Sequence, residues 1–191
     1  MGKARLEAFS DGVLAIIITI MVLEMKVPHE TEFVALQPVI PVFLSYILSF
    51  VYLGIYWNNH HHLIHAARYV NGAIMWANLH LLFWLSLIPF TTAWMGENHV
   101  APWPVALYGT VLLFAGFAYF ILTRTLIAGH GGDSTLATSI GKDVKGKTSL
   151  AAYAVAIPFS FAQPWISCVL YVLVAIMWLV PDRRIEHALT R

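Results

Sequence analysis

Apolar residues run along the chain in long blocks that contain no Asp, Glu, Lys or Arg. These uncharged blocks are residues 12–23, 33–67, 69–96, 98–123 and 148–181. A helix needs about 20 mostly apolar residues to cross a bilayer. Blocks 69–96 and 98–123 each fit one such helix, and block 33–67 fits one that starts near Pro38. The pattern therefore predicts an all-α integral membrane protein.

The last block can be read as one long tilted helix or as two short helices. Pro158 and the pair Gln163-Pro164 favour a break, because proline removes a backbone donor and glutamine is polar. Two helices joined near Gln163 would form a hairpin and return the chain to the side from which it came.

Basic residues decide between these two readings, since Lys and Arg accumulate on the cytoplasmic side of membrane proteins. With six spans and both termini cytoplasmic, only Lys26 falls outside. The ten remaining basic residues then lie inside: Lys3, Arg5, Arg68, Arg124, Lys142, Lys145, Lys147, Arg183, Arg184 and Arg191. Five spans would place the last three of them outside. We therefore expect six spans, with a polar inner loop from Gly129 to Lys147.

The expected helices form one transmembrane domain over residues 1–191, without an internal repeat. Their approximate bounds are 7–27, 38–66, 70–95, 103–127, 149–162 and 165–180.

Composition agrees with a membrane protein and excludes several other classes. Hydrophobic residues make up 59% of the chain and charged residues 11%, whereas soluble domains carry roughly 25% charged residues. The net charge of +1 and the lack of a Lys/Arg-rich tract argue against nucleic acid as a partner. The lipid bilayer is the expected surrounding, and the single cysteine, Cys168, supports neither a disulfide nor a zinc site.

Catalysis is not expected, and no cofactor is predicted. Ser10 and Asp11 are adjacent, so on a helix they point about 100° apart and cannot act as a nucleophile with its partner. The Gly-rich stretch from Gly129 to Asp133 lacks the lysine of a phosphate-binding loop.

The first helix is unusual because its uncharged run is short. Asp11 or Glu24 must lie near the hydrocarbon boundary if this helix spans, and such residues face protein or water. Helical spacing places an apolar stripe on one side of the helix and Ser10 with Asp11 away from its centre. The stripe comprises Phe9, Gly12, Val13, Ile16, Thr19, Ile20, Leu23 and Val27. Periodicity alone also allows this stripe to pack against a neighbouring helix.

Histidines suggest an alternative function. Of nine histidines, four lie between His60 and His65. On a helix only the pairs His61–His65 and His62–His65 could share a ligand. No Asp, Glu or Cys nearby completes a four-ligand site, so no metal site is predicted. A histidine-dependent metal or proton transporter remains the alternative to the function considered next.

Several short motifs resemble those of a known channel family. Residues 5–11 read R-x-x-x-F-S-D, residues 22–28 read V-L-E-M-K-V-P, and residues 56–61 read Y-W-N-N-H-H. The third helix adds W-A-N-L at 76–79 and L-I-P-F-T-T at 87–92. These segments resemble the Transmembrane Protein 175 family of potassium channels. The likeness covers about the first half of the chain at specific positions; the second half is similar in hydropathy and length.

The resemblance implies a leak-type potassium channel in the membrane of a prokaryote, with modest preference for potassium over sodium and with protons as a further candidate ion. Prokaryotic members carry one six-helix unit and assemble as homotetramers with the first helix lining the pore. The resemblance assigns Ile16, Ile20 and Leu23 to a hydrophobic constriction, with Thr19 beside them. Because hydroxyl oxygens can replace part of the water that an ion loses, we expect Thr19 to tune selectivity. The resemblance also implies a structural network, formed by Arg5, Phe9, Ser10, Asp11, His60, His61 and Asn78.

Overall fold

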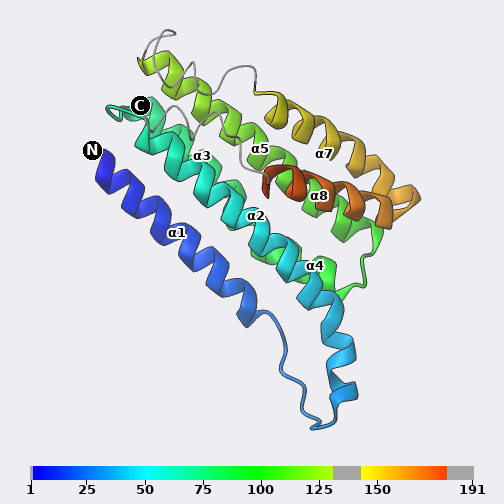
Figure 1. Ribbon diagram of the computed structural model, residues 1–191. Helices are drawn as coiled ribbons and strands as arrows, with labels where there is room; N and C mark the ends of the chain where they lie inside the picture. Colours follow the sequence, from blue (N-terminus) through cyan, green and yellow to red (C-terminus); the bar gives the residue numbers. More distant parts are fainter. Residues whose placement is uncertain (1, 131–142, 180–191) are drawn as a thin grey trace.

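The structure is a computed structural model that describes residues 2–130 and 143–179. Within these two ranges all regular secondary structure is helical, as the apolar blocks predict (Figure 1). The elements are α1 (Lys3–Leu23), the 3₁₀ segment η1 (Phe33–Val39), α2 (Ile40–His65), α3 (Gly72–Ser86), α4 (Ile88–Glu97), α5 (Pro102–His130), α7 (Val144–Ala162) and α8 (Pro164–Leu179).

The first helix begins and ends about four residues earlier than expected. It starts at Lys3, and it stops at Leu23 instead of continuing to residue 27. Pro28 disfavours the expected end at Val27, because the residue before a proline is disfavoured in the helical conformation. The uncharged stretch between Asp11 and Glu24 therefore makes up the second half of α1.

The expected third span, residues 70–95, is one apolar stretch made of two helices. Leu87 ends α3 and begins α4, and Pro89 lies in the first turn of α4. Pro89 has no N–H to donate to the carbonyl four residues earlier, so the helix breaks just before it. The break does not interrupt the apolar stretch from Gly72 to Glu97, which remains long enough to span a bilayer.

Both ends of the expected inner loop from Gly129 to Lys147 are helical in the structure. Helix α5 includes Gly129 and continues to His130, and α7 starts at Val144. Asp143 caps α7, since its carboxylate accepts a hydrogen bond from the amide of Gly146 at 3.1 Å. The expected end of the last helix at residue 180 lies outside the described residues, as do Lys142, Arg183, Arg184 and Arg191.

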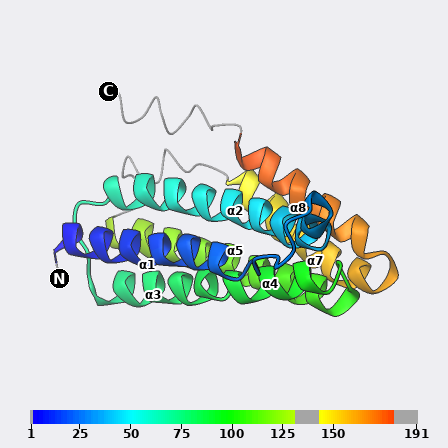
Figure 2. The ribbon, with the colours of Figure 1, turned by 90° about the horizontal axis from the view of Figure 1, so that it is seen from below.

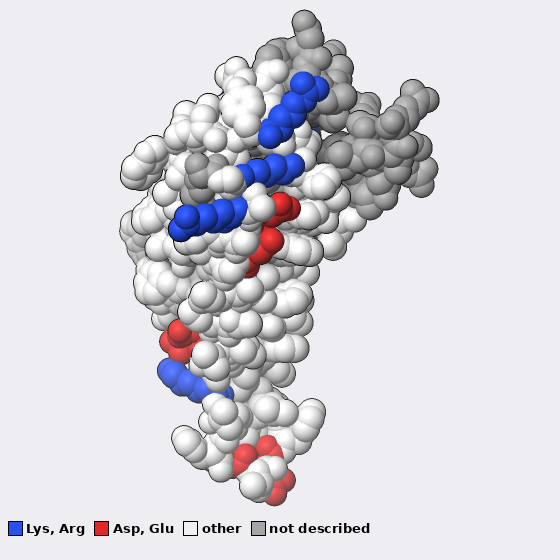
Figure 3. Space-filling model, turned by 90° about the vertical axis from the view of Figure 1, so that its left-hand side faces the viewer, with Lys and Arg blue, Asp and Glu red and all other residues white. Residues whose placement is uncertain are grey.

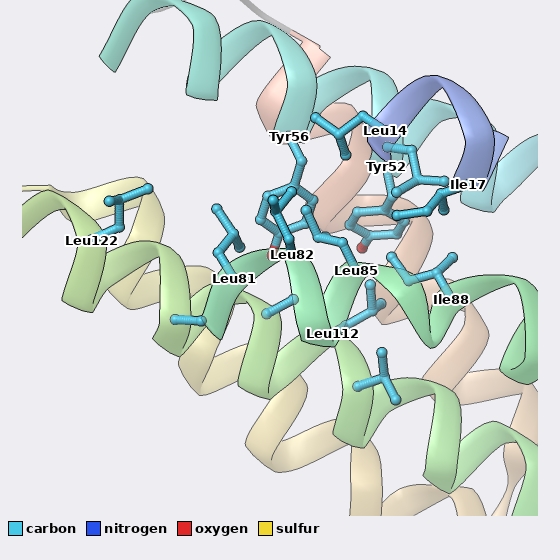
Figure 4. Close-up of a cluster of buried hydrophobic side chains, with 14 of the residues drawn as sticks. Leu14, Ile17, Tyr52, Tyr56, Leu81, Leu82, Leu85, Ile88, Leu112 and Leu122 are labelled. Carbon is cyan, nitrogen blue, oxygen red and sulfur yellow. The ribbon is translucent and has the colours of Figure 1, made fainter. Parts of the chain in front are cut away.

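Helix α5 lies at the centre of the bundle. It packs against α3, α4, α7 and α8. Helix α1 contacts α2, α3 and α4, and Figure 2 shows it between α2 and α3. Apolar side chains from α1 to α5 meet in the core shown in Figure 4, where Leu14 and Ile17 of α1 lie near Tyr52 of α2. Helices α7 and α8 form a hairpin that closes at Gln163, where the backbone is extended.

Charged residues gather toward the ends of the molecule. The face shown in Figure 3 has Lys and Arg concentrated at one end, further charges at the other, and an uncharged surface between them. Four described stretches are long and apolar enough to cross a membrane, namely Lys3–Leu23, Phe33–His65, Gly72–Glu97 and Pro102–His130. The chain is therefore a multi-pass membrane protein with an all-helical described fold.

Candidate functional site

One face of α1 packs into the bundle. The buried residues on this face recur every three or four positions, as they must to lie on one side of a helix: Leu6, Ser10, Leu14, Ile17 and Met21. Each of them is at most 5% exposed. This face anchors α1 against α2, α3 and α4.

The opposite face of α1 is not covered by any other part of the chain that the structure describes. Ile16, Ile20 and Leu23 are 58%, 40% and 79% exposed, respectively. All three residues of the expected constriction therefore lie on the surface that points away from the other helices. Phe9, at 48% exposed, lies on the same surface.

Thr19 is also exposed on this face. Its hydroxyl donates to the helix's own carbonyls, 2.9 Å from the oxygen of Ala15 and 3.0 Å from that of Ile16. A threonine hydroxyl has one hydrogen to donate and two lone pairs to accept with. Since the hydrogen is used within the helix, Thr19 presents lone pairs to whatever lies beyond this face.

A buried hydrogen-bond chain ties α1 to α2 and α3. Ser10 Oγ donates to the carbonyl of Leu6 at 2.9 Å and accepts from Asn78 Nδ2 at 2.9 Å. Asn78 Oδ1 lies 2.7 Å from His60 Nε2. Because the amide nitrogen of Asn78 faces Ser10, its oxygen must accept from His60, so Nε2 of His60 carries the hydrogen. Nδ1 of His60 is then an unprotonated lone pair, buried and without a partner among the described residues.

Asp11 and His61 lie next to this chain but bind other partners. Asp11 Oδ1 accepts a hydrogen bond from Trp57 Nε1 at 3.0 Å. His61 Nδ1 lies 3.0 Å from Glu7 Oε1. The predicted set is thus divided into a buried group of Ser10, His60 and Asn78 and two half-exposed pairs between α1 and α2.

Arg5 belongs to the predicted network but is not linked to the hydrogen bonds of Ser10, Asn78 and His60. Its side chain is exposed, and it forms no hydrogen bond or ion pair with any residue in 2–130 or 143–179. Together with Phe9 it faces outward from the single chain.

Two residues of this region escaped the sequence analysis as network members. Trp57 is part of the Y-W-N-N-H-H motif, and Glu7 lies inside the R-x-x-x-F-S-D motif. Helical spacing offered a signal for each, because Glu7 and Asp11 are four positions apart and so are Trp57 and His61. Stacking of Trp57 on His61, with ring centroids 6.3 Å apart, completes this side-by-side arrangement.

Past its last turn, the α1 segment is tied to α4. Lys26 Nζ lies 2.8 Å from Glu97 Oε1, and this hydrogen bond and the charge of Glu97 raise the pKa of Lys26. Both residues, with Glu24 and His99, line a hollow of about 460 Å³. Lys26 pairs with Glu97, and the carboxylate of Glu24 forms no ion pair with any residue in the described ranges.

The histidines do not assemble a metal site in the part of the chain that the structure describes. No three side chains among His, Cys, Asp and Glu there come together as ligands. His61 stacks on His65 with ring centroids 5.9 Å apart, and His60 is engaged with Asn78.

Comparison with known proteins gives consistent matches. A family model described as "Endosomal/lysosomal potassium channel TMEM175" matches residues 5–89. A potassium channel of Chryseobacterium sp. strain P1-3 is 54% identical over 189 residues, which cover 99% of this chain and 98% of that protein. The mouse endosomal/lysosomal proton channel TMEM175 is 28% identical over 66% of this chain and 29% of its own length.

A solved structure extends the likeness to the fold. The crystal structure of a lysosomal potassium-selective channel TMEM175 homolog from Chamaesiphon minutus matches with a TM-score of 0.78 at 29% identity. The match covers 93% of this chain and 96% of that one. The similarity therefore includes α7 and α8, which lie beyond the residues that the family model matches.

Proposed function

Since this chain belongs to the TMEM175 family, a family of membrane channels and not of enzymes, we propose that it is a leak-type, potassium-permeable cation channel whose pore is lined by α1. One observation carries the proposal: α1 is anchored by one face and leaves Ile16, Thr19, Ile20 and Leu23 on the other. Relatives named as potassium channels supply the permeant ion.

A homotetramer would give the exposed face of α1 a partner. One helix cannot enclose an aqueous path, whereas four copies around a symmetry axis present the same residues to one another. Each of Ile16, Ile20 and Leu23 would then contribute to a ring, and the three rings would be stacked along the axis. The second copy, the lipid bilayer and potassium ions are the partners that this proposal requires.

The physical consequence of such rings is closure by dewetting. An ion in a narrow apolar ring has no oxygen ligands, and the idealised cost of moving a monovalent ion into an apolar medium is of order 20 kcal/mol. A hydrophobic constriction also expels water. Conduction then requires rings wide enough for a largely hydrated ion. Potassium gives up water more easily than sodium does, so a modest potassium preference follows without a carbonyl filter.

The buried chain of Ser10, Asn78 and His60, with the Asp11–Trp57 pair, would hold α1 in register against α2 and α3. These residues lie away from Ile16 and Leu23 on the helix, which supports a structural role and argues against contact with the ion. Arg5 and Phe9 face outward from the single chain and would meet a neighbouring copy.

Six spans with cytoplasmic termini complete the proposal, in the plasma membrane of a prokaryote. The α7–α8 hairpin would supply the fifth and sixth spans, since α8 runs back alongside α7 toward the side from which α7 starts (Figure 1). Cysteines introduced at Glu97 and Lys147 should then react with an impermeant reagent from opposite sides. Labelling of both from one side would contradict this topology.

Ile16→Asn tests the pore directly. In vesicles with purified protein, we expect this variant to wet the constriction, raise potassium flux and lower the preference for potassium over sodium. Leu173→Asn is the matched control, because Leu173 is 54% exposed on α8, away from α1. If Ile16→Asn keeps the parent's flux and selectivity while the protein stays tetrameric, the pore is not built on this face.

Two further measurements separate the parts of the proposal. Mass determination of the detergent-solubilised protein should give four chains, and a conducting monomer or dimer would overturn the assembly. Reversal potentials under proton gradients test protons as a second permeant ion, which the name of the mouse relative suggests.

A further inference from the structure

His130, the last residue of α5, binds a segment that lies between α2 and α3. Its Nε2 is 2.9 Å from the backbone nitrogen of Arg68 and 3.3 Å from that of Tyr69. Its Nδ1 is 2.9 Å from the carbonyl oxygen of Leu126, one turn earlier on α5. The side chain thus joins the end of α5 to a point more than sixty positions away in the sequence.

The partners fix the protonation state of this imidazole. Backbone N–H groups only donate, so Nε2 must accept, and the Leu126 carbonyl only accepts, so Nδ1 must donate. A neutral histidine with its hydrogen on Nδ1 satisfies both requirements. An imidazolium carries hydrogen on both nitrogens, and its Nε2–H would then point at two other donors.

Tyr69 reinforces the contact. Its ring stacks on the His130 ring with centroids 4.4 Å apart and planes 26° from parallel, and its hydroxyl donates to the carbonyl of Gly129. The segment is connected further, because Lys3 of α1 donates through its ammonium to the carbonyl of His65, where α2 ends. A path of direct contacts and continuous chain therefore runs from the end of α5 to the beginning of α1.

We propose that His130 is an acid-sensitive latch: the neutral imidazole holds the α2–α3 segment to α5, and protonation releases it. Protonation would turn the accepting Nε2 into a donor, which the amides of Arg68 and Tyr69 cannot accept. The latch's place on the cytoplasmic face, and the effect of its release on ion flux, rest on the function proposed above. The latch itself rests on the contacts of His130 alone.

Surrounding charges favour release on protonation. Basic side chains lie on the neighbouring elements. Arg68 of the α2–α3 segment is exposed, and Arg124 on α5 places its guanidinium 5.1 Å from the Phe120 ring. At the end of α2, Lys3 donates to the carbonyl of His65. Tyr69 is the remaining titratable side chain in contact with His130. No carboxylate in the described ranges forms an ion pair with His130. A protonated imidazole would thus gain no described anion in exchange for the lost bonds.

Hydrogen exchange of the Arg68 and Tyr69 amides tests the latch on the full chain in detergent. Rates are compared with those of the unfolded peptide at the same pH, once near pH 7.5 and once near pH 5.5. We expect these two amides to lose protection by about fivefold or more at the lower pH, while amides within α3 keep theirs. Equal protection at both values would overturn the proposal without any variant.

Two substitutions of His130 sharpen the result. His130→Gln keeps an acceptor but cannot titrate, so protection should stay high at both pH values. His130→Lys supplies a permanent donor, so protection should be low at both. His65→Gln is the matched control and should respond to pH as the parent does. If His130→Gln loses protection in acid as the parent does, another group is responsible and the proposal fails.

Ion flux gives the second readout. With the inner pH varied in vesicles, potassium flux should change in the parent and stay constant in His130→Gln. A protein that shows the exchange effect but conducts no ions would contradict the proposed channel and leave the latch standing. A conducting protein whose Arg68 and Tyr69 amides ignore pH would contradict the latch alone.

Discussion

His60 Nε2 lies 2.7 Å from Asn78 Oδ1, so a single buried amide joins α2 to α3 and, through its nitrogen, to Ser10 of α1. Three helices are thereby fixed at one point. Asn78 and Ser10 are fully buried and His60 is 1% exposed. A polar group that is buried this deeply needs hydrogen-bond partners. Without them, the free energy lost on removing the group from water is not offset.

Replacing Asn78 should therefore destabilise the protein. Asn78→Leu removes both ends of the amide and leaves His60 with neither ring nitrogen bonded in the described structure. We expect a loss of about 1–3 kcal/mol in the free energy of unfolding, measured by denaturant titration in mixed micelles. Asn58→Ala is the control, since Asn58 is exposed and has no side-chain hydrogen bond to another described residue. Equal stability of the two variants would show that the hydrogen bonds of Asn78 do not anchor α1.

Most helices of the fold could be predicted from the sequence, because uncharged apolar blocks show where they lie and prolines indicate where they end. The break at Gln163-Pro164 was expected on those grounds and separates α7 from α8. The break at Leu87 was not, because Pro89 lies inside an apolar block and a kink there leaves the hydropathy unchanged.

Partner choice was harder to predict than position. Helical spacing separates Ser10 and Asp11 from the apolar stripe, yet it does not say that Asp11 binds Trp57 and that Glu7 binds His61. Those pairings depend on how far α2 is rotated and shifted relative to α1, and one helix's sequence does not contain that information. Lys26 with Glu97 is a similar case, since the two residues come from segments 71 positions apart.

Close backbone packing between α2 and α4 gives a second prediction. A Cβ atom on Gly96 would lie 2.6 Å from the Cα of Val42, and backbone atoms cannot move aside as a flexible side chain can. Gly96→Ala should therefore push the two helices apart and cost about 1–3 kcal/mol of stability. Gly54→Ala is the matched control on α2, because nothing lies within 4 Å of a Cβ there. Thermal unfolding of both variants in the same detergent provides the measurement. A Gly96→Ala protein as stable as the parent would mean that the helices are not this close.

The Lys26–Glu97 pair leads to a prediction about pH. Because the pKa of Lys26 is raised in the folded state, its contribution is present below the pKa of an unfolded lysine, about 10.4, and is lost as pH rises through the folded value. Lys26→Gln should thus melt slightly below the parent at neutral pH, and the difference should vanish in stronger base. Both residues are exposed, so the difference should be small and should shrink in salt. Glu32→Gln serves as the control, and a difference that grows with pH would contradict the sign.

Thr19 provides the sharpest test of selectivity, because one atom can be changed while the shape is kept. Its hydroxyl hydrogen is bound within α1, so in the proposed tetramer four sets of lone pairs would face the axis between the rings of Ile16 and Ile20. Oxygen atoms there can replace part of the water that an ion loses, and the smaller loss for potassium is the easier one to compensate.

Thr19→Val removes the oxygen and keeps the volume. It should lower the potassium-over-sodium permeability ratio by about two- to tenfold, the range expected for one net hydrogen bond. Thr19→Ser keeps the oxygen and should retain the parent's ratio, while both variants should stay tetrameric. Reversal potentials under bi-ionic conditions measure the ratio. If serine and valine shift it equally, the effect comes from packing of α1 and the hydroxyl does not face the ion.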